Sequence, residues 1–255
     1  TDIYRDKIKK IIKYYNYNKI LKKKNQNYVT SKFIQIIDKF IKEKKIKKKS
    51  IDYIGFSGQT IFHDPINKES IQLGLCKDIQ KKLNIKLVGN FRKNDLKNGG
   101  QGAPIGATYH KFIIQKYQEK SAILNVGGIS NITFLKNNKL IAFDLGPGNC
   151  IIDDITYYCY KKYFDKFGKY SFNGKINNKI LNKFKKDKFF KKKYPKSLDR
   201  NYFDKYLETL TNLKKNDAIC TATNMTIESI LYSIKSINLK INKLILTGGG
   251  RKNQY

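Results

Sequence analysis

The stretch SAILNVGGISNITFLKNNKLIAFDLGPGNCIIDD, residues 121–154, decides the fold because its apolar strand patterns stop repeatedly at polar turns that contain glycine. Its apolar and alternating runs predict three strands, at residues 122–126, 129–135 and 140–143. The third strand ends in Asp144, and a Gly-Pro-Gly turn at 146–148 follows. Asn149 is then placed to cap a helix whose apolar residues fall on one stripe. A carboxylate is thus predicted at a strand end beside the start of a helix.

Glycine turns flank this predicted hairpin, at Gly127–Gly128 and at 146–148. Glycine lets a backbone approach a ligand closely, and N–H groups at a helix start favour anions such as phosphate. The residues therefore indicate a phosphate-handling site with a carboxylate for acid–base chemistry. The alternative, that each turn merely connects sheet to helix, stays open for either glycine pair taken singly.

Composition bounds the class of protein. The 255 residues, 40% of them apolar, can bury the core of one large domain or of two smaller ones. The sequence contains no apolar run long enough to cross a membrane and no signal peptide, so a cytoplasmic protein is expected. Four cysteines without CxxC spacing and only two histidines give no zinc pattern, and the thiols are expected to be reduced.

The net charge of +33 would ordinarily suggest a nucleic-acid partner. Of the 53 basic residues, however, only Arg5, Arg92, Arg200 and Arg251 are arginines, and the lysines are spread through almost every segment. Proteins that recognise phosphates and bases often use arginine, because its guanidinium group forms bidentate hydrogen bonds with them. Solvated lysine-rich faces are therefore the preferred interpretation, and a basic nucleic-acid-binding module stays as an alternative.

Helical and strand patterns alternate along the rest of the chain, which indicates an α/β fold. Helices are predicted at 3–15, 30–46, 78–83, 105–117, 149–163 and 217–237. Further strands are predicted at 51–56, 61–64, 71–75, 85–90 and 243–246, the last of them buried.

The polar, glycine-rich segment 91–104 is predicted to be a loop that faces solvent or lines a cleft. Arg92 is one of the few arginines in a lysine-rich chain, which suggests a planar, bidentate task such as gripping a carboxylate or sugar oxygens. Asp95, Gln101 and Gln59 offer hydrogen bonds of the kind that sugars accept. His63 could donate to a ligand, although a single histidine is more often structural.

The two ends of the sequence are abrupt. The chain begins with a residue other than methionine at the head of a helix, and it stops five residues after the three glycines at 248–250. A buried strand entering a glycine-rich loop normally leads into a helix that packs on the sheet. The sequence is therefore expected to be an internal part of a longer protein.

Six segments together carry a family resemblance: IGFSGQTIFHDP (54–65), FRKNDLKNGGQGAP (91–104), LNVGGISNIT (124–133), FDLGPGNCIIDD (143–154), PKSLDRNYF (195–203) and LTGGGRKN (246–253). In order and spacing they resemble the anhydro-N-acetylmuramic acid kinase family over nearly the whole chain. The resemblance implies the sugar kinase, actin and Hsp70 fold, a ribonuclease H-like architecture of two α/β domains, here incomplete at both ends. Residues 1–120 would then be the remainder of the N-terminal lobe with its substrate loop, and 121–255 the second lobe with a phosphate hairpin and an adenosine loop.

The same resemblance implies a reaction: ATP, water and the 1,6-anhydro sugar give N-acetylmuramic acid 6-phosphate and ADP, in recycling of the cell wall. ATP and Mg²⁺ are the implied cofactors. Asp144 would be the catalytic general base that removes a proton from water. The implied cofactor-binding residues are Gly127, Gly128, Ser130, Asn131, Gly146, Gly248, Gly249 and Gly250. The implied substrate-binding residues are Gln59, Arg92, Asp95, Gln101, Gly102 and Asn149.

The resemblance also implies partners and shows departures. The amino sugar and ATP are the expected partners, without nucleic acid or membrane, and a homodimer is left open. Ser57 stands where the family usually has histidine, and Asn90 where it commonly has aspartate. The family's first phosphate loop, a Gly-Thr-Ser-x-Asp-Gly sequence, is missing, so these 255 residues alone are expected to be inactive. Another kinase of the same fold, acting on a different sugar or an acyl group, remains an alternative.

Overall fold

The computed structural model describes residues 2–117, 120–237 and 240–255, and the chain divides into two compact units, residues 1–102 and 103–255. The boundary lies earlier than the predicted boundary after residue 120. The reason is α5 (Ala107–Lys116), which packs on the strands of the second unit and therefore belongs to it.

The second unit is built on a four-stranded mixed sheet. Its strands are β5 (Ser121–Val126), β6 (Ile129–Lys136), β7 (Lys139–Pro147) and β8 (Lys243–Thr247), in the order β7-β6-β5-β8. The first three form an antiparallel meander, and β8 returns parallel to β5. The three predicted strands of the meander are confirmed.

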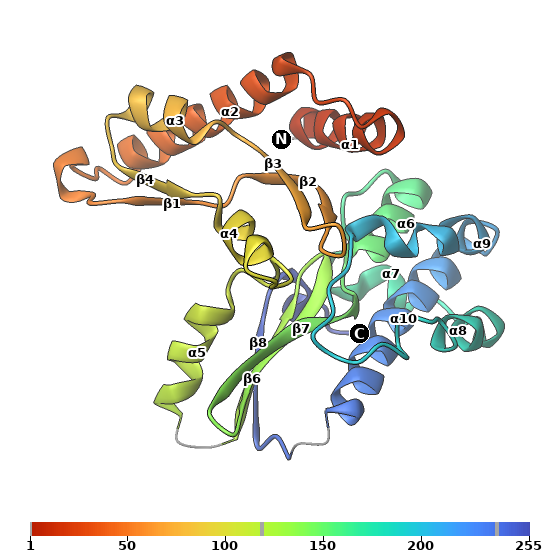
Figure 1. Ribbon diagram of the computed structural model, residues 1–255. Coiled ribbons are helices and arrows are strands. Elements are labelled where there is room, and N and C mark those ends of the chain that lie inside the picture. Colours follow the sequence, from red (N-terminus) through yellow and green to blue (C-terminus); the bar gives the residue numbers. More distant parts are fainter. Residues whose placement is uncertain (1, 118–119, 238–239) are drawn as a thin grey trace. The chain divides into compact units, whose positions relative to one another are not determined.

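Helices cover both faces of this sheet. Figure 1 shows α5 on one side and α10 on the other, and α10 packs against β7. The helices of this side are α6 (Cys150–Tyr160), α7 (Lys169–Phe172), α8 (Asn178–Lys185), α9 (Leu207–Thr211) and α10 (Lys215–Ser236), with short 3₁₀ turns at Lys166–Gly168, Arg200–Tyr206 and Gly249–Lys252. One apolar cluster, which includes Phe134, Phe143 and Leu145, lies between sheet and α10, and a larger one joins the helices to one another.

Two features of the sheet differ from prediction. Strand β7 does not stop at Asp144 but continues to Pro147. Between Ser130 and Asn131 of β6 the register shifts, because a β-bulge on β7 accommodates one extra residue between Asp144 and Gly146. Strand β8 is not buried: Leu244 is 40% and Leu246 is 52% exposed. Its apolar sequence predicted a buried strand, but within the described residues β8 pairs on one side only.

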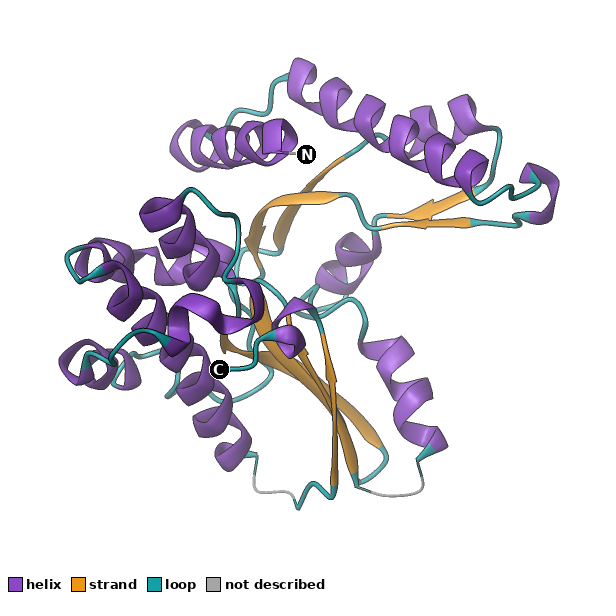
Figure 2. Cartoon of the chain, turned by 180° about the vertical axis from the view of Figure 1, so that it is seen from behind, coloured by secondary structure: helices purple, strands orange, loops and turns teal. Residues whose placement is uncertain are grey.

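The first unit contains two small sheets and four helices (Figure 2). Strand β1 (Ile54–Phe56) pairs in parallel with β4 (Leu87–Gly89), and β2 (Gln59–Asp64) pairs antiparallel with β3 (Glu69–Leu73). The helices are α1 (Asp2–Asn18), α2 (Lys23–Glu43), α3 (Cys76–Leu83) and α4 (Phe91–Lys97), with a 3₁₀ turn at Lys48–Ser50. Apolar side chains of α1 and α2 form a core with β2 and β3, and α2 and α3 form a second core with the β1–β4 pair. The predicted α/β class is confirmed.

Helix α4 lies in the segment that was predicted to be a loop. It is seven residues long, and Leu96 is its one buried side chain. A helix this short and polar has too few apolar residues to show a helical period, which is why the pattern indicated a loop.

Candidate active site

Main-chain hydrogen bonds join the turn after β5 to the turn after β7. The N–H groups of Gly148 and Asn149 donate to the carbonyls of Gly128 and Gly127 over 2.8 and 2.7 Å, and Cys150 N–H donates to Gly128 O over 3.0 Å. A Cβ on Gly148 would collide with the carbonyl of Gly127, so the turns can approach this closely only because glycine stands here. The N–H groups of Gly148, Asn149 and Cys150 are thus bound to protein carbonyls, and the phosphate site predicted at this helix start stays a prediction.

Asn149 stands at the predicted capping position but its side chain does not cap α6. Its Nδ2 donates instead to the carbonyls of Val126 and Gly127, over 3.1 and 3.0 Å. The predicted side-chain cap was therefore wrong. The close contact of the two turns puts two carbonyls within reach of the amide, which links the start of α6 to the end of β5.

The three glycines after β8 lie against the same end of β5. Gly248 has a φ of +84°, and a Cβ there would meet the backbone of Val126, while a Cβ on Gly250 would meet the Val126 side chain. Because β5 and β8 are parallel neighbours, both loops leave the same edge of the sheet. The Gly127–Gly128 turn and the three glycines at 248–250, at least 120 residues apart in the sequence, are thus neighbours in this unit.

Packing does not require glycine at every position of these turns. Gly128 is exposed, and a Cβ there would meet no atom within 4 Å. Gly249 is also exposed, and a Cβ there would meet only the Asn149 amide, at 3.9 Å. These two glycines are the positions of the turns that a ligand could approach.

Ser130 and Gly146 have roles inside the protein. The Ser130 hydroxyl is fully buried and lies 3.1 Å from the carbonyl oxygens of both Gly146 and Pro147. Gly146 has a φ of +153°, and a Cβ there would meet Ser229 of α10. Both residues hold the β7 bulge, and their expected place beside a nucleotide stays a prediction.

A row of polar residues crosses the sheet at this edge. The strand register pairs Thr247 with Asn125, Asn125 with Asn131, and Asn131 with Asp144. Directly paired residues on neighbouring strands have side chains on the same face. The predicted base Asp144 and the predicted nucleotide residue Asn131 therefore share a face, next to the glycine turns.

Asp144 is held at two atoms by one neighbouring segment. Its N–H donates to the carbonyl of Lys196 over 2.9 Å, and its Oδ2 accepts the N–H of Leu198 over 2.8 Å. The side chain is buried, with Asp144 only 5% exposed. Tyr194 of the same segment stacks on Phe143, with ring centroids 4.9 Å apart. The segment thus provides a hydrogen-bond acceptor for a backbone N–H of the edge strand β7, and it fixes the orientation of the Asp144 carboxylate.

In the first unit, the structure brings together three of the predicted substrate residues. Arg92 Nη1 donates to the carbonyl of Gly102 over 3.1 Å, and the N–H of Gly102 donates to Asp95 Oδ2 over 2.6 Å. Gly102 has a φ of +65°, and a Cβ there would meet the buried Leu96. Arg92 and Asp95 thus hold both sides of one loop residue, a contact that residue type alone did not predict.

Gln59 and Gln101, the other predicted substrate residues of this unit, do not bind Gly102 in the way that Arg92 and Asp95 do. Gln59 begins β2, and its Oε1 accepts the Tyr4 hydroxyl over 3.4 Å. Gln101 is half-buried, and its backbone raises the pKa of His63.

His63 belongs to this region; the sequence left open whether it donates to a ligand or is structural. It is 7% exposed on β2, with Nδ1 3.0 Å from Ser70 Oγ. Burial, followed by the nearby charge of Arg92, lowers its pKa to about 4, while Asp64 acts in the opposite direction. His63 is therefore a neutral imidazole at pH 7, next to the predicted sugar-binding arginine. Its place in the GQTIFHDP motif was the available signal.

The comparison with known proteins can now be set beside this geometry. Residues 3–255 match the family Anhydro-N-acetylmuramic acid kinase. The chain belongs to this family. Among curated relatives, the anhydro-N-acetylmuramic acid kinase of Zymomonas mobilis subsp. mobilis is 35% identical over 230 residues, which are 89% of this chain and 62% of the relative. Those of Rhodopseudomonas palustris and Sulfurimonas denitrificans are 35% and 34% identical over 88% of the chain. The chain thus spans less than two thirds of the length of these relatives.

Sequence reasoning missed two residues that contact the predicted base of this anhydro-N-acetylmuramic acid kinase family member. Lys196 and Leu198 were not among the predicted site residues, although the PKSLDRNYF segment that contains them was part of the resemblance. Within the described ranges, no three His, Cys, Asp or Glu side chains gather as a metal site, and no helix is long and apolar enough to span a membrane.

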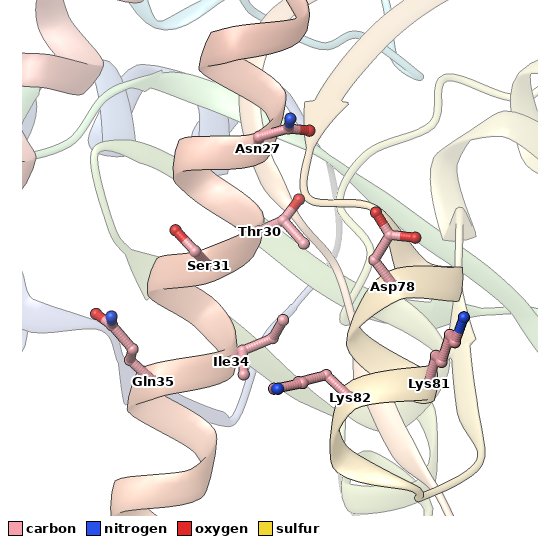
Figure 3. A pocket seen from close by; sticks show the side chains of 8 residues that line it. All are labelled: Asn27, Thr30, Ser31, Ile34, Gln35, Asp78, Lys81 and Lys82. Atoms are coloured by element: carbon pink, nitrogen blue, oxygen red, sulfur yellow. The ribbon is translucent and has the colours of Figure 1, made fainter.

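A groove in the first unit lies away from all the predicted residues. It has a volume of about 670 Å³ and is lined by side chains of α2 and α3 (Figure 3). Its lining residues are Asn27, Thr30, Ser31, Ile34, Gln35, Asp78, Lys81 and Lys82. None of them is a predicted site residue, so the groove adds nothing to the candidate site.

Proposed function

We propose that the protein phosphorylates 1,6-anhydro-N-acetylmuramic acid with ATP and opens the anhydro ring with water, giving N-acetylmuramic acid 6-phosphate and ADP in peptidoglycan recycling. Family membership supports this reaction. The observation that carries it at the level of residues is the position of Asp144, a carboxylate held in one orientation in the polar row that crosses the sheet edge from which the glycine turns leave.

Asp144 would act as the general base. It takes a proton from a water molecule whose oxygen forms a bond to the anomeric carbon, while the bond from that carbon to the bridging oxygen breaks. The bridging oxygen becomes the 6-oxygen and accepts the γ-phosphoryl group. General base catalysis typically contributes about 10²- to 10⁴-fold. The bond from Leu198 N–H keeps the carboxylate oriented, so little reorganisation is needed before the proton moves.

The glycine turns would receive the nucleotide. Gly128 and Gly249 are the exposed positions where a Cβ would meet little protein, so the chain can come close to phosphate or adenosine there. Asn131 lies in the polar row between these turns and Asp144. The ends of β5 and β8 at which the turns lie are carboxyl ends, the usual location of ligands in α/β sheets.

Magnesium would be carried with the nucleotide. Mg²⁺ is usually bound by one or two carboxylates together with phosphate oxygens and water, so no cage of protein ligands is required. When bound, it would neutralise negative charge on the phosphates. The described residues fit such a site, since Asp144 provides a carboxylate at the sheet edge where the glycine turns lie.

The sugar would be held by residues of the first unit. Arg92, with its planar guanidinium, suits the lactyl carboxylate, and Asp95 holds the Gly102 loop against it. Gln59 and Gln101 would contribute amide hydrogen bonds. This proposal treats the two units as parts of the two lobes of a sugar kinase.

The proposed setting follows from the reaction. Both substrates are small soluble molecules, so a cytoplasmic enzyme without nucleic-acid or membrane partners is proposed, with a homodimer as a compatible assembly.

The test is a substrate panel with the intact protein. ADP release is measured with anhydro-N-acetylmuramic acid, with N-acetylmuramic acid, with other sugars and with acyl acceptors, each at equal concentration. We expect release with the anhydro sugar and at least about tenfold less, or 1.4 kcal/mol in the barrier, with every other acceptor. Preference for another sugar or for an acyl acceptor would replace the proposal with a different kinase of the same fold.

A further inference from the structure

Lys196 is the one lysine among the described residues that is buried, with 7% exposure. Burying an ammonium group costs free energy, and an apolar side chain of similar length would fill the same space without that cost. The contacts of the Lys196 amine therefore indicate why a lysine is buried at this position.

Its contacts join two segments. The Nζ donates to the carbonyl of Phe189 over 3.3 Å and lies 4.3 Å from the centre of the Phe189 ring. In the opposite direction, the carbonyl of Lys196 accepts the N–H of Asp144, and Leu198, two residues on, donates to the Asp144 carboxylate. Lys196 thus ties the segment that holds Asp144 to the turn at Phe189.

That turn is itself rigidly held. The buried carboxylate of Asp187 accepts the N–H of Phe189 over 2.9 Å and the hydroxyls of Tyr202 and Tyr206, each over 3.0 Å. Its Oδ2 also pairs with Lys205 Nζ at 2.6 Å. Because these hydrogen bonds fix the turn at Phe189, the bond from Lys196 to the Phe189 carbonyl also restrains Lys196.

We propose that Lys196 is a positioning residue for Asp144, acting through the 196–198 segment that binds the carboxylate. The inference rests on the proposed function, in which Asp144 is the base. It adds a residue that touches neither substrate but decides how well the carboxylate is aimed. Burial, with a smaller effect from the neighbouring charge of Lys192, lowers the pKa of Lys196 to about 8, as expected for an amine enclosed by Phe189.

The test compares Lys196→Met with Lys192→Met, a matched change at the neighbouring, largely exposed lysine. The intact protein is assayed for kcat, for KM of the anhydro sugar and of ATP, for the pH profile of kcat/KM, and for its melting temperature. We expect Lys196→Met to lower kcat about tenfold with KM changed less than about twofold, because the carboxylate is less well aimed. A looser bond from Leu198 to the carboxylate favours its protonated form, so the acid limb of the profile moves to higher pH. Lys192→Met should resemble the wild type, and Lys196→Arg, which keeps charge and donor, should recover part of kcat.

Wild-type kcat and an unshifted acid limb in Lys196→Met would overturn the positioning role. Should that variant fail to fold, Lys196→Leu, which also lacks the donor, is judged by the same criteria. Failure of the proposed function has a different signature: Asp144→Asn would retain its rate, whatever Lys196→Met does. A loss of stability in Lys196→Met without any shift of the acid limb would also contradict the inference, because a merely structural lysine gives that result.

Discussion

Burial lowers the pKa of basic side chains of this protein, His63 and Lys196 among them. The pKa of His63 falls to about 4 and that of Lys196 to about 8, because an environment with little water disfavours the charged form. At both positions the unfolded chain binds a proton more tightly than the folded chain does. Each residue therefore makes stability depend on pH within a window between its two pKa values.

For His63 the window runs from pH 6.5 down to about 4. Above it the imidazole is neutral in both states and contributes no pH dependence. Within it the unfolded chain takes up the proton first, so stability falls as the pH falls, by up to about 3 kcal/mol near pH 4. His63→Asn should remove this part of the acid sensitivity, which urea unfolding at pH 7 and pH 4.5 would measure. An equally large pH dependence in variant and wild type would contradict the buried, neutral histidine.

At the scale of elements, the junction of β5 with α6 depends on Asn149 as a donor. A capping asparagine can be replaced by aspartate with little cost, since both caps accept a hydrogen bond. A donor to two carbonyls cannot, because a carboxylate has no N–H to give. Asn149→Asp should therefore destabilise the protein by about 1 to 3 kcal/mol, at least as much as Asn149→Ala. Chemical denaturation of both variants measures this, and a nearly wild-type Asn149→Asp would restore the capping interpretation.

The glycine turns offer a matched pair of substitutions. Gly128→Ala introduces a Cβ into open space and should change the free energy of unfolding by no more than about 0.5 kcal/mol. Gly148→Ala drives a Cβ into the carbonyl of Gly127 and should destabilise by about 2 kcal/mol or more. If the nucleotide lies over Gly128, the stable Gly128→Ala variant should still raise the KM for ATP about tenfold, or 1.4 kcal/mol. An unchanged KM would remove Gly128 from the nucleotide site.

How much the sequence predicts at this scale depends on the range of the interactions. The meander and the long helices were predictable, because their apolar periods are local. The β7 bulge was not, since it arises from the pairing of Ser130 with Gly146 across two strands. The contacts of Asn149 and the 196–198 segment were missed for the same reason: their partners, Gly127 and Asp144, are distant in sequence.

At the scale of the whole molecule, the net charge of +33 predicts weak, non-specific attraction to polyanions. The scarcity of arginines argues against sequence-specific recognition of nucleic acid. Fluorescence anisotropy with a labelled DNA duplex should show binding at low salt that is lost at about 150 mM salt, since each neutralised phosphate adds to the salt dependence. Submicromolar binding that persists at that salt concentration would revive the nucleic-acid alternative.

Family and fold class were within reach of the sequence, because six motifs in a fixed order and spacing carry much more information than any one of them. The boundary between the units was not, because the place of α5 depends on its packing against β6. Among the candidate residues, the sequence identified Asp144, Arg92 and Asp95 by chemical type. It could not show that Arg92 and Asp95 bind one loop residue, Gly102, from both sides.

The central claim, that Asp144 activates water, has one direct test. The intact protein, wild type and Asp144→Asn, is incubated with anhydro-N-acetylmuramic acid and ATP in ¹⁸O-labelled water, and preformed product in the same water serves as the exchange control. We expect rapid labelling of the anomeric oxygen by the wild type, beyond that control, and a loss of about 10²- to 10⁴-fold in rate for Asp144→Asn, with the fold intact. A retained rate in Asp144→Asn, or wild-type product without the label, would contradict it.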